Sequence, residues 1–486
     1  MIKVGLIPLD SRPCNTIWID SLTKIANLEI LMYPREKCGT LFKGANIDEI
    51  INWLNQNAHL MDYLIISTDG LCFGGLIQAR KAQIDLDKVV KQLDIIKELK
   101  NKYPKLKIFV FDTIMRIAIT TLDKESQVYA PAINEYGRLR GQYHFFKKEE
   151  DKKKLEELEK YIPSHLLETY LKARKTKLFL NKYFLSLIKD KVIDRMILLQ
   201  EDSFPFGIQA IDQEEICNKM EEYDIVDKVQ FYNGTDEGAG VLLGRIIVDE
   251  YQMTPKVYLH MPNKMKKTLD KCHLFEDRPF SENLYKMFNT IGLEETKNID
   301  DASFVLALYA EEENTDLILD KYIEVPVNKD DDYKEFVNKL NDIIKQKPVL
   351  FVDLFFPNGG SLELLEDINC KDLLGYSAWN TSSNSLGTAL CNAVAYLVNP
   401  NSKTNKAFLK ERIMDDCIYQ YVARRIVSED LINKGHSVYN LEEANAYALE
   451  ETKKIMEKYN YLIEHTPYEI KFPWGRMFEI EIKVEE

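Results

Sequence analysis

Short runs of apolar residues recur along the chain, and a turn rich in acidic, glycine or asparagine residues follows most of them. Met196–Leu199 is such a run, and the polar turn Gln200–Gly207 comes directly after it. An uninterrupted apolar run of this kind is typical of a strand buried on both faces, as in a parallel sheet. Segments whose apolar residues recur at helical spacing, such as Leu86–Leu99, lie between the runs and predict helices. The alternation predicts an α/β protein.

We expect a (β/α) barrel-like N-terminal part, a second α/β unit and a helical C-terminal region that ends in a short β-hairpin. Doubly wound parallel sheets are the alternative, because both arrangements are built from the same β–α repeats. The predicted strands are Lys3–Pro8, Leu28–Met32, Tyr63–Ser67, Lys107–Phe111, Met196–Leu199, Lys228–Tyr232, Lys256–His260, Phe304–Tyr309, Val349–Asp353 and Leu373–Tyr376, with Tyr468–Phe472 and Phe478–Val484 as the terminal pair.

A chain of 486 residues is too long for one small core and predicts several domains. We assign residues 1–262 to a β/α catalytic domain with a helical insertion at about 120–190. Residues 263–400 are expected to form a second α/β domain that contributes to the site, and residues 401–486 the helical C-terminal region. Within the insertion, Arg174 and Asn181 are spaced to share one helix face.

Composition narrows the classes of function. The net charge of −14 disfavours nucleic acid and anionic membranes as partners, although it says little about a small neutral substrate. From the candidate residues we expect a small-molecule or carbohydrate substrate. Apolar runs are too short to span a membrane, and the N-terminus lacks a signal-peptide pattern, so we expect a cytoplasmic protein. The eight cysteines contain no Cys-x-x-Cys pair and the seven histidines no His-x-x-x-His pair, so no metal site and no cofactor is predicted from them. The oligomeric state is left open.

Candidate chemistry lies in the turns that follow the predicted strands, because the carboxyl ends of parallel strands meet at one edge of a sheet or one mouth of a barrel. Two turns carry adjacent acids, Glu201–Asp202 and Asp236–Glu237, which we take as catalytic candidates. A single acid at such a place is also typical of a helix cap or a structural ion pair, and that alternative stays open. The substrate-binding candidates are Asp10, Arg12, Asn15, Asp69, Asp112, Arg116, Asp353, Trp379, Asn380 and Asn384.

Two of these turns have further features. The glycines that follow Asp69 match no phosphate-binding pattern and predict a tight turn that exposes this carboxylate. Trp379 with Asn380 and Asn384 would suit a sugar, because an indole ring can stack on it and the amides can bind its hydroxyls. A cap formed by asparagine, with Trp379 in the core, is the alternative.

Eight motif segments along the chain form a recognisable set: Pro8–Asn15, Asp69–Leu76, Ile114–Arg116, Glu201–Gly207, Gly234–Glu237, Pro357–Gly359, Trp379–Thr388 and Pro473–Glu479. Together they resemble a bacterial family of unknown function, DUF4127, over nearly the whole chain. Position 201 is Glu, where the resemblance implies Asp. The resemblance implies a family but no activity, so function must be inferred from the residues.

Our first hypothesis is a glycoside hydrolase, which needs one carboxylic acid to protonate the leaving oxygen and a second group to attack or stabilise the anomeric carbon. Asp202 is the predicted acid, with Glu201 or Asp236 as its partner, since crowded acids raise one another's pKa. By analogy with barrel hexosaminidases that use the substrate's own acetamido group as nucleophile, an N-acetylated hexosaminide is a candidate substrate.

Two other classes stay open. Several carboxylates with few histidines suit a hard cation, so a Mg²⁺- or Mn²⁺-dependent hydrolase or phosphoryl-transfer enzyme fits the same residues. Arg12 and Arg116 would then hold a phosphate. The third class is a noncatalytic sugar-binding protein.

Overall fold

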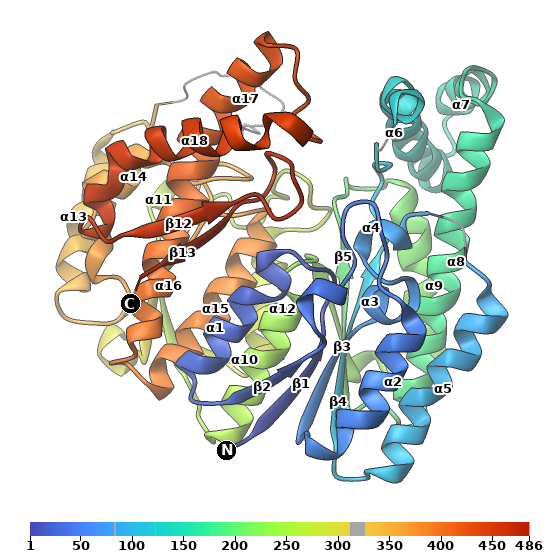
Figure 1. Cartoon of the computed structure of the whole chain (residues 1–486), viewed down its shortest axis with the longest axis horizontal. Helices are drawn as coiled ribbons and strands as arrows, with labels where there is room; N and C mark the ends of the chain where they lie inside the picture. Colours follow the sequence, from blue (N-terminus) through green and yellow to red (C-terminus); the bar gives the residue numbers. More distant parts are fainter. Residues whose placement is uncertain (82–83, 122, 312–325, 486) are drawn as a thin grey trace. The chain divides into compact units, whose positions relative to one another are not determined.

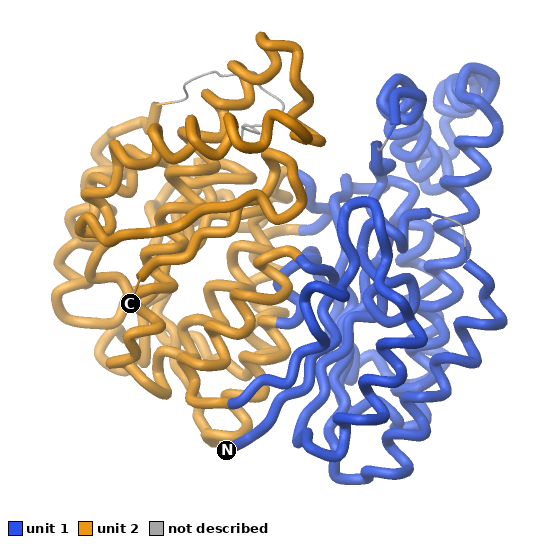
Figure 2. Tube along the Cα trace, in the orientation of Figure 1, with its two compact units in different colours: residues 1–11, 29–239, 275–278 blue, residues 12–28, 240–274, 279–486 orange. Residues whose placement is uncertain are grey.

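The computed structural model describes residues 1–81, 84–121, 123–311 and 326–485. The chain divides into two compact units, which Figure 2 shows in blue and orange. Each unit combines segments that are distant in the sequence. Unit 1 contains Met1–Ser11, Glu29–Ala239 and Phe275–Arg278, and unit 2 contains Arg12–Leu28, Gly240–Leu274 and Pro279–Glu486.

Unit 1 is built on a six-stranded parallel sheet with the strand order β2-β1-β3-β4-β5-β6 (Figure 1). The chain starts inside the sheet, adds β2 on one side, and then adds β3 to β6 in succession on the other side. This reversal is the order of a doubly wound sheet. The strands are β1 (Lys3–Ile7), β2 (Glu29–Met32), β3 (Tyr63–Ser67), β4 (Lys107–Ile114), β5 (Arg195–Gln200) and β6 (Val229–Asn233).

The sheet of unit 1 is open, which corrects the expectation of a barrel-like N-terminal part. In the described part of the chain, β2 and β6 are its edges and do not pair with each other. Barrels and open sheets share the same buried apolar strands, and only the pairing of the first and last strands closes a barrel. The predicted α/β class is confirmed, and the doubly wound alternative is the arrangement found.

Several helices of unit 1 share a hydrophobic core with one face of this sheet. Leu54 of α2, Ile96 of α5 and Phe184 of α8 belong to this core together with Ile66 and Val110 of the sheet. Helices α6, α7 and α8 contribute to a second, smaller hydrophobic cluster. The helices of unit 1 are α2 (Ile47–Asn57), α3 (Thr68–Phe73), α4 (Leu76–Ala79), α5 (Leu86–Lys102), α6 (Lys124–Phe146), α7 (Glu149–Tyr161), α8 (Ser164–Lys189) and α9 (Ile208–Glu222).

Unit 2 contains a second parallel sheet, with the order β8-β7-β9-β10-β11, so the predicted second α/β unit is confirmed. Its order repeats that of the first five strands of unit 1. An antiparallel pair of strands near the C-terminus, with Tyr468 opposite Val484, confirms the predicted hairpin. The strands are β7 (Lys256–His260), β8 (Glu294–Thr296), β9 (Phe304–Tyr309), β10 (Val349–Asp353) and β11 (Gly375–Ser377), with β12 (Tyr468–Lys471) and β13 (Glu481–Val484) in the hairpin.

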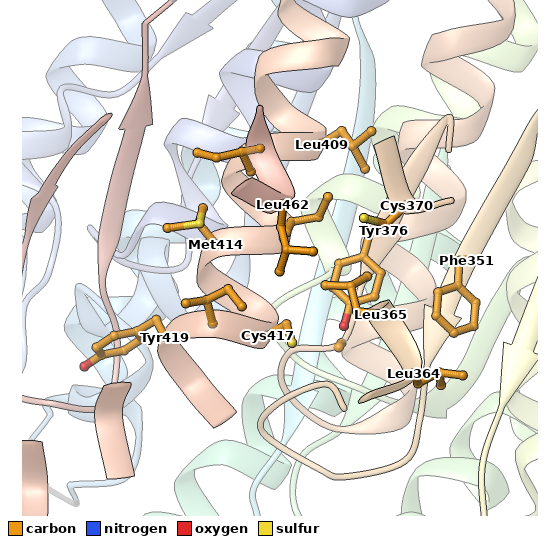
Figure 3. Packing of buried hydrophobic residues seen from close by; sticks show 14 of the residues in the cluster. Phe351, Leu364, Leu365, Cys370, Tyr376, Leu409, Met414, Cys417, Tyr419 and Leu462 are labelled. Carbon is orange, nitrogen blue, oxygen red and sulfur yellow. The ribbon is translucent and has the colours of Figure 1, made fainter. Parts of the chain in front are cut away.

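The sheet, the hairpin and the C-terminal helices of unit 2 share one core, part of which is drawn in Figure 3. Phe351 of β10 and Tyr376 of β11 lie in it with Cys417 and Tyr419 of the π-helical segment Ile413–Ala423. The α-helices assigned to this half of the fold are α1 (Ile17–Ile25), α10 (Gly238–Glu250), α11 (Asn263–Lys266), α12 (Phe280–Ile291), α13 (Asp331–Ile344), α14 (Leu362–Asp367), α15 (Ser382–Val398), α16 (Lys403–Arg412), α17 (Arg424–Asn433) and α18 (Asn445–Met456).

Short 3₁₀ turns complete the secondary structure: Pro13–Asn15, Arg35–Lys37, Ala58–Leu60, Val226–Lys228, Ile299–Asp301, Cys370–Asp372, Glu442–Ala444 and Glu457–Ile463. Across the described ranges, every helix is too short or too polar to cross a membrane. Six of the eight cysteines are buried, where they pack as small apolar side chains.

Candidate functional site

The carboxyl edge of the unit 1 sheet collects the acids that the sequence analysis singled out there. The sheet is parallel, so the residues at the ends of neighbouring strands lie along one edge. The catalytic or binding roles of these residues remain predictions. The acids at this edge are Asp10 after β1, Asp69 after β3, Asp112 in the last part of β4, Glu201 and Asp202 after β5, and Asp236 and Glu237 after β6.

Two of these acids share one buried lysine. Lys177 of α8 contacts Asp69, and its Nζ lies 2.9 Å from Oδ1 of Asp112. The hydroxyl of Thr113 donates to Oδ2 of Asp69 (2.6 Å), and Nδ2 of Asn181 donates to Oδ2 of Asp112 (2.6 Å). All five side chains are buried. Buried charges of opposite sign hold one another in this way when each is also hydrogen-bonded.

Burial corrects the expectation that Asp69 is exposed. The residue lies in the short helix α3, whose N-terminus is capped by Ser67 Oγ accepting from the Gly70 N–H (3.1 Å). Burial raises the pKa of Asp69 to about 6, although Lys177 opposes this rise. Burial also acts to lower the pKa of Lys177, but the carboxylates of Asp112 and Asp69 outweigh it and the pKa is raised. Lys177 is therefore a fixed cation inside the sheet edge.

The adjacent acids after β5 each have an arginine partner. Arg80 donates to Oε2 of Glu201 from Nε (3.0 Å) and also contacts it from Nη2. Nη1 of Arg116 lies 3.4 Å from Oδ2 of Asp202. Glu201 is buried, whereas the side chain of Asp202 is 41% exposed. Of the two acids, Asp202 is the one that solvent can reach.

The two arginines lie near each other. Both donate to the hydroxyl of Thr120, Nη1 of Arg80 and Nη2 of Arg116 each at 3.4 Å. Burial and the charge of Arg80 lower the pKa of Arg116 to about 10, although Asp202 and Glu201 oppose this. An anionic group of a ligand, in addition to Glu201 and Asp202, would have two guanidinium groups as hydrogen-bond donors here.

Asp69, Asp112, Glu201 and Asp202 each lie beside a lysine or an arginine, whereas Glu237 has no ion-pair partner among the residues that the structure describes. Its Oε2 accepts from the Thr235 N–H (2.8 Å), while Oε1 has no hydrogen-bond partner among the residues described. Burial raises the pKa of Glu237 to about 8; the Thr235 N–H opposes this rise, and the charges of Asp236 and Glu276 add to it. Glu237 is consequently a carboxylic acid that keeps its proton at neutral pH.

A segment from far along the chain completes this edge, and the sequence analysis missed it. The N–H of Ser203 donates to the carbonyl of Phe275 (2.8 Å). Asp277 accepts from Nδ2 of Asn233 (3.1 Å) and from Nε2 of Gln213 (2.7 Å). No motif marks Phe275–Arg278 as part of unit 1, so only the tertiary structure identifies Glu276 as a neighbour of Glu237.

Lys177 and Arg80 were also missed, although one signal for Lys177 exists. Arg174 and Asn181 share a helix face as predicted: Arg174 donates to the carbonyl of Arg116 (2.7 Å), and Asn181 bonds Asp112. Lys177 lies between them on this face, at helical spacing from both. The recurrence of polar residues at positions 174, 177 and 181, on the face that also carries Tyr170, Leu180 and Phe184, could have identified it.

Comparison with protein families places these motifs in a known group. A family model described as a protein of unknown function, DUF4127, matches residues 4–483. The chain belongs to the DUF4127 family. Neither the curated proteins nor the solved structures contain a match to it.

The remaining predicted site residues of this DUF4127 protein belong to unit 2: Arg12, Asn15, Asp353, Trp379, Asn380 and Asn384. Asp353 accepts from the N–H groups of Phe355 (3.0 Å) and Ser361 (2.7 Å), so it organises its own turn. Burial raises the pKa of Asp353 to about 7, against the effect of these bonds. Arg12 lies over the ring of Trp474, with 5.3 Å between the guanidinium carbon and the ring centre.

Trp379 lies in the core, which is the alternative considered for it. Its ring packs edge-on against Trp18, with centroids 5.6 Å apart, and its Nε1 has no hydrogen-bond partner in the described part of the chain. Nδ2 of Asn384 donates to the hydroxyl of Thr381 (3.0 Å), and the carbonyl of Asn380 accepts from the Asn358 N–H (2.7 Å). Asn15 is buried in the 3₁₀ turn Pro13–Asn15. Among the described residues, no group of three or more His, Cys, Asp or Glu side chains is placed to hold a metal ion.

Proposed function

We propose that this DUF4127 protein is a glycoside hydrolase-like enzyme that uses the acids at the carboxyl edge of unit 1, with N-acetylated hexosaminides as the first candidate substrates. The observation that carries the proposal is the contrast between Glu237, which keeps a proton at neutral pH, and Asp202, a partly exposed acid beside an arginine. The turns that hold them are linked, since Nδ2 of Asn233 donates to the hydroxyl of Ser203 (3.3 Å). Glycosidases require this pairing of an acid with a carboxylate.

In this proposal Glu237 transfers its proton to the glycosidic oxygen as the bond from that oxygen to the anomeric carbon breaks. The positive charge that develops at the anomeric carbon is met by the carboxylate of Asp202, or by the acetamido oxygen of the substrate. Water then forms a bond to the anomeric carbon and gives one proton back to Glu237, which completes the hydrolysis. The ion pair of Glu201 with Arg80 holds the turn that carries Asp202 in position. The sequence analysis predicted Asp202 as the acid; we assign the proton to Glu237 because its pKa is raised to about 8.

Aryl glycosides with different leaving groups test this assignment. The wild-type protein is expected to hydrolyse a nitrophenyl hexosaminide or hexoside, with activity that falls as the pH rises through about 8. Glu237→Gln should lower kcat by roughly 10²- to 10⁴-fold. Dinitrophenolate leaves without protonation, so the same variant should retain most activity on dinitrophenyl glycosides. Asp202→Asn should lose activity on both, and Glu98→Gln, on the exposed surface of α5, is the control.

Two results would contradict the proposal. The first is no turnover of any hexosaminide or hexoside by the wild-type protein. The second is full activity in both Glu237→Gln and Asp202→Asn. Sugar binding measured by calorimetry without turnover would instead favour the noncatalytic sugar-binding protein.

The arginine pair favours one second candidate, a phosphoryl-transfer enzyme or metal-dependent hydrolase that uses Mg²⁺ or Mn²⁺. Arg80 and Arg116 lie close enough for one to lower the pKa of the other, and an anionic substrate would relieve that repulsion. Phosphate-ester assays with added Mg²⁺ or Mn²⁺, before and after EDTA, separate this candidate from the first. Activity that EDTA abolishes and the added metal restores would favour it over the glycosidase.

A further inference from the structure

An aromatic surface continues from the turn that carries Asp202. Phe204 and Phe206, in the same turn, are 42% and 49% exposed, and Phe146 at the end of α6 is 51% exposed. The ring of Phe206 lies 4.9 Å from that of Phe146 and 5.8 Å from that of Phe145, measured between centroids. Exposed single apolar side chains are ordinary, but the contact of Phe206 with Phe145 and Phe146 makes a continuous aromatic surface beside a candidate site, and such patches are often functional.

Phe206 has an unusual backbone conformation. Phe206 has a φ of +59°, a left-handed conformation that is rare for a bulky side chain and costs about 1 kcal/mol or more. Two bonds to the carbonyl of Phe204, from the Gly207 N–H (3.1 Å) and from Nε2 of Gln209 (2.7 Å), keep the turn in place. The structure therefore maintains an exposed aromatic ring at an energetic cost.

Helix α6 packs against the turn that carries Phe206. A Cβ on Gly141 of α6 would lie 2.2 Å from the backbone of Gly207, so the helix and the turn are in direct backbone contact. This contact fixes Phe146, which is on α6, relative to Phe206. The rings form a prearranged surface, and a ligand that binds to it loses little free energy to ordering.

The surface lies within reach of the acids. Phe206 follows Asp202 by four residues, so their Cα atoms are at most about 14 Å apart. This span is short enough for a chain of two or more sugar rings to reach both places. The combined exposed area is roughly 300 Å², if a free phenylalanine exposes about 200 Å². A stable interface between two copies of the chain needs about 800 Å² from each partner. This aromatic surface is therefore too small to form such an interface by itself.

We propose that Phe204, Phe206 and Phe146 form an outer subsite that stacks on a sugar ring of a neutral oligosaccharide whose cleaved bond lies at Asp202 and Glu237. This inference rests on the proposed function and extends it from aryl glycosides to longer chains. The apolar C–H face of a pyranose ring matches an aromatic plate, while its hydroxyls remain in water. Flat aromatic rings give such contact area with little loss of side-chain entropy.

Variants at Phe206 test the subsite with hexamers of N-acetylglucosamine and of glucose as probes. Binding is measured by calorimetry in the Asp202→Asn background, so that the probe is not consumed. Phe206→Ala should weaken hexamer binding about tenfold, which corresponds to about 1.4 kcal/mol. Phe206→Leu should also weaken it, because Leu is apolar but lacks a ring face, whereas Phe206→Trp should bind as tightly as the parent. Phe179→Ala, at a ring that is 48% exposed on α8, is the matched control and should bind normally.

The outcomes separate this inference from the proposed function. If hexamer binding depends on the ring at position 206 but the wild-type protein hydrolyses no glycoside, the subsite is supported and the proposed glycoside hydrolase activity is rejected. If the protein hydrolyses aryl glycosides but does not bind the hexamers, or binds them equally in all Phe206 variants, the subsite is rejected and the proposed glycoside hydrolase activity is retained. Dimers that dissociate in Phe206→Ala, with hexamer binding unchanged, would assign the surface to contact between copies and also overturn the inference.

Discussion

The buried acid Glu237 is expected to make the free energy of unfolding depend on pH, and the substitution Glu237→Gln is expected to remove this contribution. Its pKa is raised from 4.5 to about 8 by burial, with the charges of Asp236 and Glu276 adding to the rise. Between these two values the unfolded chain releases the proton and the folded protein keeps it. The free energy of unfolding then falls by about 1.4 kcal/mol for each pH unit. Over the whole interval Glu237 contributes a loss of about 5 kcal/mol.

The sign follows from the direction of the shift. The stabilisation due to the raised pKa is fully present below pH 4.5 and is lost as the pH rises through about 8. Glu237→Gln keeps the shape of the side chain but cannot ionise, so it lacks this dependence. Other buried acids, such as Asp69 and Asp353, titrate in both proteins, and their contributions cancel in the difference.

Urea unfolding of the wild-type protein and Glu237→Gln at several pH values between 4.5 and 8.5 measures the effect. We expect the free energy of unfolding of the variant, relative to wild type, to rise steadily by several kcal/mol over this range, and the exposed-site control Glu98→Gln to show no such trend. Difference infrared spectroscopy should also detect a protonated carboxyl group at pH 7 that the variant lacks. A difference in stability that stays constant with pH would refute the reasoning.

Two further substitutions test contacts of the same edge. Lys177→Met leaves Asp69 and Asp112 buried without their shared cation and should lower the free energy of unfolding by about 3–5 kcal/mol. The triple variant Asp69→Asn, Lys177→Met, Asp112→Asn has no buried charge at this place and should restore most of that free energy. A loss below about 1 kcal/mol for Lys177→Met in urea unfolding would contradict this. Gly141→Ala should cost about 1–3 kcal/mol because its Cβ meets the Gly207 backbone, whereas Gly240→Ala, whose nearest neighbour is at 3.7 Å, should be tolerated; equal thermal midpoints for the two variants would rule out the close contact of α6 with the turn.

Local patterns of the sequence determined the elements of this fold. The predicted strands Tyr63–Ser67 and Val349–Asp353 coincide with β3 and β10, because a run of apolar residues bounded by polar turns reports burial directly. Alternation of polar and apolar residues similarly predicted the terminal hairpin. The short edge strand β8 was missed, since its sequence Glu-Glu-Thr at Glu294–Thr296 has no apolar run.

Local patterns also located the acids but not their surroundings. That Glu201, Asp202, Asp236 and Glu237 follow strands could be predicted from the runs before them. Their differing states could not, because these depend on groups distant in the sequence: Arg80 for Glu201, and Glu276 for Glu237. Charge interactions act through space, so the partner of an acid is set by the fold and not by the residues beside it.

Sequence alone therefore determined most of the segments that become strands, with β8 the exception, and it showed that the chain is an α/β protein with acids at strand ends. Three features were decided only by the tertiary structure: the sheets are open, Asp69 forms a buried ion pair with Lys177, and Phe275–Arg278 belongs to unit 1. The physical reason is one of range. Burial periodicity is encoded residue by residue, whereas strand pairing and charge neutralisation are settled only when distant segments come into contact.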